Sequence, residues 1–552
     1  MGGRKPAKEG GAPIWAPLRV GRFRNLWLAN LVSNFGYLIQ GVGAAWLMTL
    51  ISTDAQMVAL VQTAMQLPIL VFALLAGAFA DLLERRKVLL AAQVWMLGIG
   101  LLLAVLGGLG LVTPWLLLGL TFLVGAGMAV NGPTTQAVVR ELVPPELLAA
   151  AVTLNAVSFN LARATGPAIG GSIVAWAGPQ AAFLVNACSY LPLILVLLLW
   201  RGRRKAPDLP RERVLPAMAA GLRYVGQTPA IWHAMARGAL FGFAATAVMA
   251  LLPLIARDVL RGGPTVFGLL LGVFGVGALG GAFIVQPIRQ RYGTERPVAV
   301  MAGLFGGALL VVGFLPGWLT VIPALLVMGG CWLGSLSSFN IGVQLSSAFW
   351  VQARVLAVYQ MVLFGGMALG SWLWGLGAEL YGVLPALLAA GSVMLGQLLL
   401  QPLLALPSGR PPDMRPAGRR EGFTPEVPVA EGEGPVMLQV EYRIAPDDAP
   451  AFLAAMDDLG HQRRRNGALR WRLFQDVADA GHWIETFLVS DWLDQRRLLE
   501  RTTTEDLATQ KRAFAFHRGS GPPLIRRMIA RRQDSRFVIA PEERIHGAAA
   551  GG

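Results

Sequence analysis

The chain is long, apolar and basic. Its 552 residues are 55% hydrophobic and 14% charged, with a mean hydropathy of +0.54, which excludes an ordinary soluble domain and indicates a polytopic membrane protein. The net charge is +13 before Pro435 (29 basic against 16 acidic residues) and +2 from there on (18 against 16). Because the excess lies beside apolar segments, we expect no nucleic-acid partner. Cys188 and Cys331 lie within apolar segments, so we expect no disulfide and no Cys-based zinc site. We also expect no other metal and no cofactor.

Residues 1–23 lack the apolar core of a signal peptide and are predicted to form a cytoplasmic tail. Apolar segments then follow one another, each of the roughly 20 residues that a bilayer requires. They lie at 25–51, 56–80, 88–110, 114–137, 147–176, 179–200, 230–257, 264–288, 297–316, 318–346, 351–378 and 382–404. The sequence therefore predicts an all-α bundle of twelve transmembrane helices.

Basic loops alternate with nearly uncharged loops along these spans. One set of loops carries Arg22, Arg24, residues 85–87, Arg140, residues 201–205, Arg289, Arg291, Arg354 and Arg410. The intervening loops are almost free of Lys and Arg, apart from Arg257 and Arg261. Since positive charge holds loops in the cytoplasm, we expect both termini to be cytoplasmic, which requires an even number of spans.

A charged hinge joins the second and third spans. Gly77 and Asp81 are four residues apart and so share one face of a helix. The glycine lets a second helix approach, and the carboxylate can then accept hydrogen bonds from the free amides of that helix's N-terminus. Arg85, Arg86 and Lys87 follow as a basic loop.

The fifth span contains a second informative pattern. Gly166 and Gly170 form a small-residue face for close packing, while Pro167 removes one backbone hydrogen bond and bends the helix. Together with Gly171, these residues resemble the G-P-x-x-G-G motif of helix 5 in exporters and antiporters of the major facilitator superfamily.

The hinge also resembles a major facilitator motif, the loop between helices 2 and 3, although Leu82 and Glu84 depart from its usual arginine and glycine. A less complete copy of this hinge pattern follows 204 residues later, with Val285 in place of the acidic residue. The resemblance implies two six-helix halves with a substrate site between them near mid-membrane.

The same resemblance implies a conformational switch at the hinge. Its members are Gly77, Asp81, Arg85, Arg86 and Arg354. By resemblance, Asp81 caps the eleventh span, which begins near Arg354, when the protein opens outward.

Polar side chains within the spans are candidate cavity residues. A cation at mid-span costs about 2.5–3.5 kcal/mol, so Arg163 is predicted to face the cavity or a partner, where it could hold an anionic or polar group of the cargo. The other candidates are Asn30, Asn34, Gln62, Asn131 and Asn160. In the alternative interpretation, Arg163 pairs with Asn131, Gln136 or backbone carbonyls, and the asparagines of the first span join helices. No carboxylate is identified as a proton carrier.

Beyond the spans, the composition becomes that of a soluble domain. Residues 405–434 are rich in Pro, Gly and Arg and are predicted to form a linker. Strands are expected at 436–444, 469–476, 482–490 and 524–529, and helices at 446–462 and 492–517. This is the β-α-β-β-α-β order of a ferredoxin-like α+β domain. Residues 536–552 are predicted to be disordered.

Residues 463–467, 470–476 and 485–492 are similar to the C-terminal domain of a bacterial exporter subfamily, the transmembrane secretion effectors, which include the enterobactin exporter. In some members this domain resembles the antibiotic-biosynthesis monooxygenases, which work without metal or flavin. The resemblance favours a dimerisation or regulatory module over catalysis.

The predicted domains are a tail (1–23), an N-terminal half (24–200), a cytoplasmic linker (201–229), a C-terminal half (230–404), a second linker (405–434), a ferredoxin-like domain (435–535) and a tail (536–552). The predicted function is export across the bacterial inner membrane of a small amphipathic molecule, such as a siderophore, drug or secondary metabolite, by alternating access. Protons are the expected coupling ion, the lipid bilayer and a second copy are the expected partners, and no enzymatic activity is expected. The alternatives are a nutrient symporter and a membrane-anchored, cofactor-free monooxygenase.

Overall fold

The computed structural model describes residues 13, 15–82, 84–200, 214–406, 413–415, 417, 425–430 and 432–530. The predicted tail 536–552 lies outside the described residues, as do most of the tail 1–23 and parts of the linkers 201–229 and 405–434. For some residues within helices, among them 73–82 at the end of α2 and Asn160, only the backbone is described. The chain divides into two compact units, Met1–Met414 and Arg415–Gly552, and each is described by itself.

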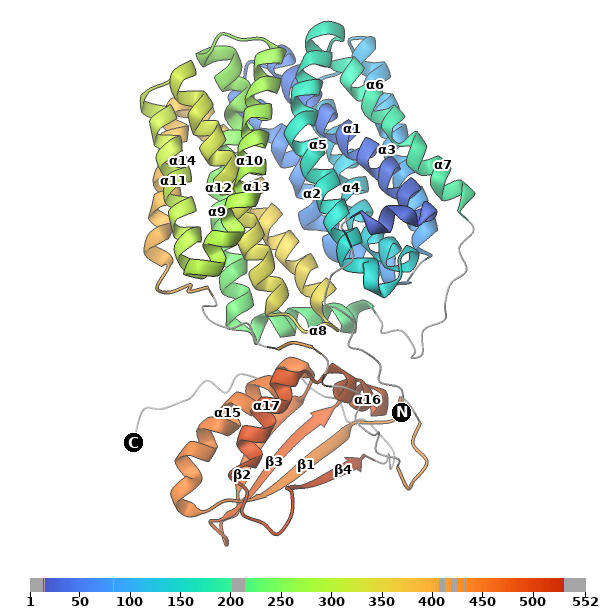
Figure 1. Ribbon diagram of the computed structural model, residues 1–552, viewed down its shortest axis with the longest axis vertical. Helices are drawn as coiled ribbons and strands as arrows, with labels where there is room; N and C mark the ends of the chain where they lie inside the picture. The colour runs from blue at the N-terminus through green and yellow to red at the C-terminus, as the bar shows by residue number, and fades with distance from the viewer. Residues whose placement is uncertain are drawn as a thin grey trace, which may run out of the picture. The chain divides into compact units, whose positions relative to one another are not determined.

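The first unit is a bundle of long helices (Figure 1). They are α1 (Gly21–Ile51), α2 (Ala55–Leu82), α3 (Arg85–Gly108), α4 (Pro114–Leu142), α5 (Leu148–Ala177), α6 (Pro179–Ser189), α7 (Leu191–Leu199), α9 (Pro229–Leu254), α10 (Pro264–Tyr292), α11 (Glu295–Phe314), α12 (Trp318–Leu345), α13 (Gln352–Tyr381) and α14 (Val383–Gly396). Within the described residues, eleven spans are long and apolar enough to cross a membrane, with α6 and α7 counted as one. The 30-residue α5, which packs against α1 and α10, completes the twelve that the sequence predicts.

Prolines set several helix boundaries. Pro114, Pro179 and Pro264 stand in the first turns of α4, α6 and α10, where the missing amide would have no helical partner in any case. Pro192 has the opposite effect, because it lies inside the predicted span 179–200 and removes an amide there. The span is accordingly divided at Tyr190 into α6 and α7.

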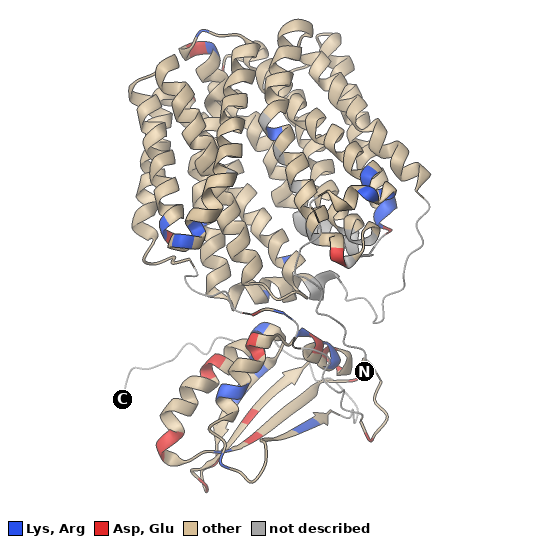
Figure 2. Cartoon of the chain, in the orientation of Figure 1, with Lys and Arg blue, Asp and Glu red and all other residues tan. Residues whose placement is uncertain are grey.

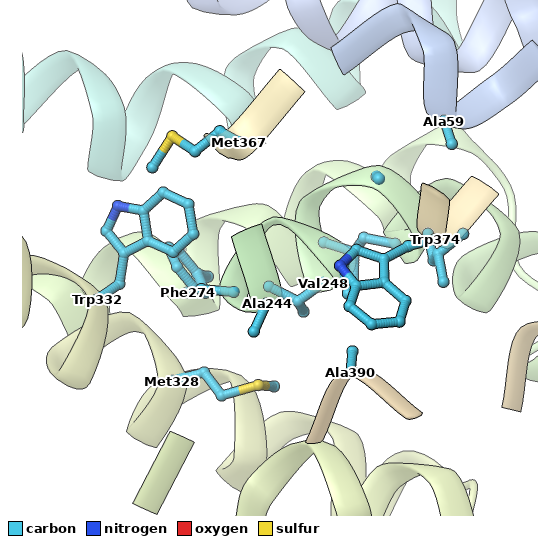
Figure 3. Packing of buried hydrophobic residues seen from close by; sticks show 14 of the residues in the cluster. Ala59, Ala244, Val248, Phe274, Met328, Trp332, Met367, Trp374 and Ala390 are labelled. Atoms are coloured by element: carbon cyan, nitrogen blue, oxygen red, sulfur yellow. The ribbon is translucent and has the colours of Figure 1, made fainter. Parts of the chain in front are cut away.

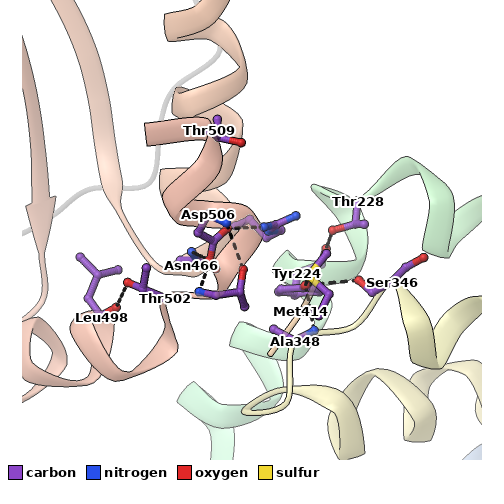
Figure 4. A network of polar contacts seen from close by, with 12 residues as sticks. Tyr224, Thr228, Ser346, Ala348, Met414, Asn466, Leu498, Thr502, Asp506 and Thr509 are labelled. Atoms are coloured by element: carbon purple, nitrogen blue, oxygen red, sulfur yellow. Dashed lines mark hydrogen bonds and ion pairs between the residues drawn. The ribbon is translucent and has the colours of Figure 1, made fainter. Parts of the chain in front are cut away.

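A further helix, α8 (Val214–Gly226), lies within the predicted linker 201–229. Its Tyr224 is fully buried, donates a hydrogen bond to the carbonyl of Ser346 (3.3 Å) and accepts one from the amide of Ala348 (3.0 Å) (Figure 4). The Tyr224 ring also meets Trp350 edge-on, with 5.9 Å between centroids. These contacts attach α8 to the connection between α12 and α13.

The bundle has two halves, α1–α7 and α9–α14, which lie on different sides in Figure 1. It also has two distinct ends, since Lys and Arg lie mainly near one of them (Figure 2). We call the end where α1 begins, and where Arg22, Arg86, Arg291 and Arg354 lie, the basic end. The opposite end is where α1 ends and α2 begins.

One cluster of buried apolar side chains runs through both halves. Ala59 of α2 belongs to it, together with Phe274, Trp332 and Trp374 of the second half (Figure 3). Lipid tails are as apolar as these side chains, so association of the helices depends on close packing and hydrogen bonds instead of a hydrophobic drive. Small residues provide that packing, as the site described below shows.

The second unit is the predicted ferredoxin-like domain. Its elements are β1 (Val436–Arg443), α15 (Ala449–Asn466), β2 (Leu469–Gln475), β3 (His482–Val489), α16 (Trp492–Arg501), α17 (Thr504–Phe514) and β4 (Leu524–Ile529). The antiparallel sheet has the order β2-β3-β1-β4, and α15 and α17 lie on one of its faces (Figure 1).

The prediction of one helix at 492–517 is wrong in detail, because this segment forms two helices. Thr503 begins α17 with a capping box: its side chain accepts from the amide of Asp506, whose carboxylate accepts from the amide of Thr503. The same carboxylate accepts hydrogen bonds from Asn466 (2.9 Å) and Arg465 (2.6 Å) (Figure 4). This buried network fixes the break between α16 and α17 against the end of α15.

Candidate functional site between the two helical halves

The glycine motif of α5 packs this helix closely against one helix of its own half and one helix of the other half. A Cβ atom at Gly170 would lie 3.1 Å from the Cα of Ile39 on α1, within the same half. A Cβ at Gly171 would lie 2.6 Å from the Cα of Gly268 on α10, in the other half. Two backbones this close leave no room for a side chain, so Gly171 and Gly268 form a direct contact between the halves. Pro167 also takes part, since its carbonyl oxygen would lie 2.8 Å from a Cβ at Gly268.

A second contact between the halves joins α2 and α13. The hydroxyls of Thr63 and Ser371 lie 2.7 Å apart. Nearer the opposite end, the amide of Ala55 donates to the carboxylate of Glu379 at 2.5 Å. Ala55 is the first residue of α2, so the Glu379 carboxylate lies at the positive end of that helix's dipole.

Two further contacts between the halves lie at the same end. The guanidinium of Arg257 donates to the carbonyl of Thr49 (2.8 Å). The rings of Trp46 and Phe267 stack with 6.2 Å between centroids. All of these residues lie in the part of the bundle near the opposite end, where the two halves are therefore closed against each other.

Arg163 lies below this closure, at the middle of α5. It shares one face of the helix with Pro167 and Gly171, which follow at positions i+4 and i+8, and this face meets the other half. Its guanidinium carbon lies 5.4 Å from the ring centroid of Trp332, at the middle of α12. The Trp332 ring in turn packs against Phe274, with 5.8 Å between centroids. A cation and an aromatic ring thus meet across the interface at mid-bundle.

The Trp332 ring offsets only part of the cost of this charge. A cation–π contact contributes about 0.5–2 kcal/mol, against about 2.5–3.5 kcal/mol for placing a cation at mid-membrane. Among the described residues, Arg163 has neither an ion pair nor a hydrogen bond. The guanidinium of this partly exposed residue therefore lacks, among the described residues, the acceptors that an arginine in this setting usually has.

The other cavity candidates lie elsewhere in the first half. Asn34 donates to the hydroxyl of Ser158 (3.3 Å), which joins α1 to α5. Asn131 accepts from Gln93 (2.8 Å), which joins α3 to α4. The remaining candidates are Gln62, which accepts from Gln66 at 3.4 Å, Asn30, which is half-buried on α1, and Asn160, whose side chain is not described. Asn34 thus has the helix-joining partner of the alternative interpretation, whereas Asn131 pairs with Gln93 instead of Arg163. The cavity role of both residues stays a prediction.

The predicted switch is described only in part. At Gly77 and Asp81 only the backbone is described, so the predicted capping of α13 by Asp81 lies outside the described contacts. Arg85 begins α3. Arg86 donates to the carbonyls of Leu197 (2.7 Å) and Leu198 (3.0 Å) at the end of α7, and the side chain of Arg354 lies against Gly221 of α8.

The second unit contains a buried carboxylate. Glu485 is fully buried and accepts hydrogen bonds from Tyr442 (2.9 Å), Arg463 (3.1 Å) and Trp471 (3.0 Å). The pKa of the Tyr442 hydroxyl is raised mainly by burial and secondly by the Glu485 carboxylate. The phenol therefore stays protonated and donates its hydrogen bond. Since each group has a partner within the core, the network serves to hold α15 on the sheet.

Three contributors to the interface between the halves escaped the sequence analysis. Trp332 and Gly268 lie in uniformly apolar stretches, which give no sign of a partner in the other half. Glu379 is distinctive as a carboxylate near the end of a span, but its partner is a backbone amide, which no sequence pattern marks. The cost of a cation at mid-span indicated that Arg163 needs a partner, but not that the partner is aromatic.

Comparison with known proteins identifies the family of the chain. The profile of a family described as transmembrane secretion effector matches residues 12–535. The multidrug efflux pump Tap of Mycolicibacterium fortuitum is 29% identical over 403 residues, 66% of this chain and 91% of that protein. The enterobactin exporter EntS of Escherichia coli O6:K15:H31 is 28% identical, covering 72% and 95%. A gallate transporter of Pseudomonas putida is also 28% identical, covering 61% and 77%.

Solved structures share the fold of the helical bundle. A POT family transporter in complex with 5-aminolevulinic acid has a TM-score of 0.57 at 13% identity, covering 69% of this chain and 96% of that chain. A bacterial homologue of the human lysosomal transporter Spinster, in an inward-facing and occupied conformation, has a TM-score of 0.55 at 13% identity, covering 70% and 96%. The chain therefore belongs to the transmembrane secretion effector family of major facilitator transporters, which are multi-pass membrane proteins.

Proposed function

We propose that the protein exports a small amphipathic molecule from a bacterial cell by alternating access of α1–α7 and α9–α14. The observation that carries this proposal is the position of the contacts between the halves. Among the described side chains, the hydrogen bonds and the closest backbone contact between the halves lie near the opposite end, while Arg163 and Trp332 meet at mid-bundle below them. A transporter closed at one end, with a site halfway across, is what alternating access requires.

The charge of the loops supports an orientation. Positively charged loops stay in the cytoplasm, so we propose that the basic end and both termini are cytoplasmic and that the bundle, closed at its opposite end, faces inward. Gln136 on α4 and Gln344 on α12 support this proposal. Both side chains are exposed in the part of the bundle near the basic end, although they belong to different halves, and Gln344 also donates to Asn340 (2.7 Å). Exposed amides favour water around the helices at this end, because lipid cannot satisfy their remaining hydrogen bonds.

The proposed cargo class is a siderophore, drug or secondary metabolite, and the proposed coupling ion is the proton. The efflux pump Tap and the enterobactin exporter support export. The gallate transporter favours the second candidate, uptake of a nutrient by symport. The proposed role of Asp81 is to cap α13 in the outward-open state.

Transport in inverted membrane vesicles tests the proposal. A panel of labelled siderophores and hydrophobic drugs would be offered with and without an imposed proton gradient, to vesicles with wild-type protein and to vesicles without it. Export predicts accumulation inside inverted vesicles that requires the gradient. Loss of preloaded compound from inverted vesicles, with accumulation only in right-side-out vesicles, would support the symporter and refute export.

We further propose that the second unit pairs with a second copy through the sheet face that its helices leave open, and that it is not catalytic. Along β1 and β3, alternate side chains such as Met437 and Leu488 lie on that face. The exposed apolar side chains Phe474 and Met528, 53% and 36% exposed, belong to it as well. Sedimentation of residues 425–530 should give a dimer that Phe474→Asp dissociates. Leu453→Asp, on α15, is the control, and a monomeric wild type would refute the pairing.

A further inference from the structure

The interface between the halves contains two hydrogen-bond donors without acceptors. The guanidinium of Arg163 has no hydrogen bond or ion pair among the described residues. The indole nitrogen of Trp332 is buried and likewise has no acceptor among them. The two donors belong to α5 and α12, one in each half. A buried donor without an acceptor is costly, and so is a cation at mid-membrane without a counter-charge, so the two groups in contact favour a bound molecule that supplies what both lack.

The kind of acceptor follows from the donors. A guanidinium presents a planar set of N–H groups that matches an oxyanion such as a carboxylate. Arg163 is partly exposed, so a bound molecule can reach it. A neutral acceptor would satisfy hydrogen bonds but would leave the charge at mid-bundle uncompensated.

The Trp332 ring indicates a second feature of the bound molecule. Arg163 covers one part of the ring, while Phe274 and Phe305 pack around it at centroid distances of 5.8 and 6.5 Å. An anion that draws the guanidinium off the ring would uncover an aromatic surface within a rigid aromatic cluster. A flat aromatic group can then stack there in place of the guanidinium.

We propose that Arg163 and Trp332 form the cargo site, and that the cargo is an aromatic molecule carrying an oxyanion. This inference rests on the proposed export function. The guanidinium binds the oxyanion, and the ring of the cargo lies on Trp332. Because the two residues come from different halves, a molecule held by both is bound tightly only while α5 and α12 are close. Separation of the halves beside Gly171, two turns from Arg163, divides the site and releases the cargo.

Equilibrium binding to the purified full-length protein tests this site without a gradient. The probe is 2-naphthoate, compared with naphthalene-2-carboxamide, which lacks the charge, and cyclohexanecarboxylate, which lacks the aromatic ring. We expect each comparison compound to bind about tenfold more weakly or worse than 2-naphthoate. Equal binding of all three compounds, or no binding of 2-naphthoate, would overturn the proposal.

Variants separate the two roles. Arg163→Gln should abolish the preference for naphthoate over the carboxamide, whereas Arg163→Lys should keep part of it. Trp332→Leu should abolish the preference for naphthoate over cyclohexanecarboxylate and keep the preference for charge. Arg291→Gln is the matched control, because Arg291 also lies over a ring, that of Tyr292, at 5.5 Å, but at the basic end. A loss of binding in the control equal to that in Arg163→Gln would contradict the assignment.

Thermal unfolding distinguishes a cargo site from a structural contact. If Arg163 is held ready for an anion, Arg163→Gln should unfold at a higher temperature than the wild type without ligand, and naphthoate should stabilise only the wild type. A lower unfolding temperature for the variant would assign Arg163 a structural role instead. Gradient-driven vesicle transport of other compounds, together with no binding of naphthoate, would refute this site and leave the export function standing.

Discussion

Replacing Gly268 by alanine should open the closed end of the transporter. The new Cβ would lie 2.7 Å from the Cα of Gly171 and 2.8 Å from the carbonyl oxygen of Pro167. Both atoms belong to the backbone and cannot turn aside, so α5 and α10 must separate. Overpacking of this kind costs about 1–3 kcal/mol. The cost falls on the closed state alone, which lowers the ratio of closed to open molecules by about 5- to 150-fold.

Distances between spin labels at the opposite end measure this shift. Leu111, in the loop after α3, and Leu319, in the first turn of α12, are exposed in different halves at that end. Labels would be attached to cysteines at these two positions after replacement of Cys188 and Cys331. Gly268→Ala should add a population with longer distances. Gly280→Ala on the same helix is the control, because its Cβ would meet nothing within 4 Å.

The outcome decides whether the glycine contact is a gate. Identical distance distributions in wild type, Gly268→Ala and Gly280→Ala would show that the helices do not part at this contact. Longer distances in both variants would show that any added methyl group on α10 has the same effect. Either result would refute the reasoning from backbone contact.

Three further predictions follow. Glu379→Gln should lower the ratio of closed to open molecules by only about two- to fivefold, measured with the same label pair. A carboxylate at a helix N-terminus contributes about 0.3–1 kcal/mol, and the amide oxygen of glutamine can still accept from Ala55. A decrease as large as that of Gly268→Ala would contradict this. Asp81→Asn should slow turnover while the protein stays in the membrane, and unchanged turnover in vesicles would exclude a switch role. Burial, and then Glu485, raises the pKa of Tyr442 above its unfolded value near 10, so its contribution to domain stability is complete below about pH 10 and is lost as the pH rises further. Because no other tyrosine follows residue 381, phenolate absorbance in the isolated second unit should appear only with unfolding, and phenolate in the folded domain would contradict the prediction.

The helical spans were predictable because each depends on a local property of the chain. A run of about 20 apolar residues needs a helix in a bilayer whatever lies beside it. The order of strands and helices in the second unit followed from similar local patterns, and the confirmed fold of both units reflects this. Local patterns failed where a single residue decides the outcome, as when Pro192 divides the sixth span and Thr503 begins a new helix.

The partners of the site residues were less predictable, because they come from distant parts of the chain. The motif at Gly166–Gly171 indicated close packing, yet only the structure shows that Gly171 meets α10 while Gly170 meets α1. Arg163 was predicted to face the cavity or a polar partner, and its contact is instead with the ring of Trp332, 169 residues later in the chain. Helix packing in a membrane depends on how well two helix surfaces fit over many residues. The order of residue types along one helix does not reveal which surface it will meet.

Alternating access is tested most directly by measuring both ends of the bundle in the same sample. One label pair would be placed at Leu111 and Leu319, and a second pair at Glu146 and Phe349, which are exposed at the basic end in different halves. In Gly268→Ala, we predict longer distances at the opposite end together with shorter distances at the basic end. Distances that lengthen at both ends, or that change at one end alone, would contradict transport by alternating access.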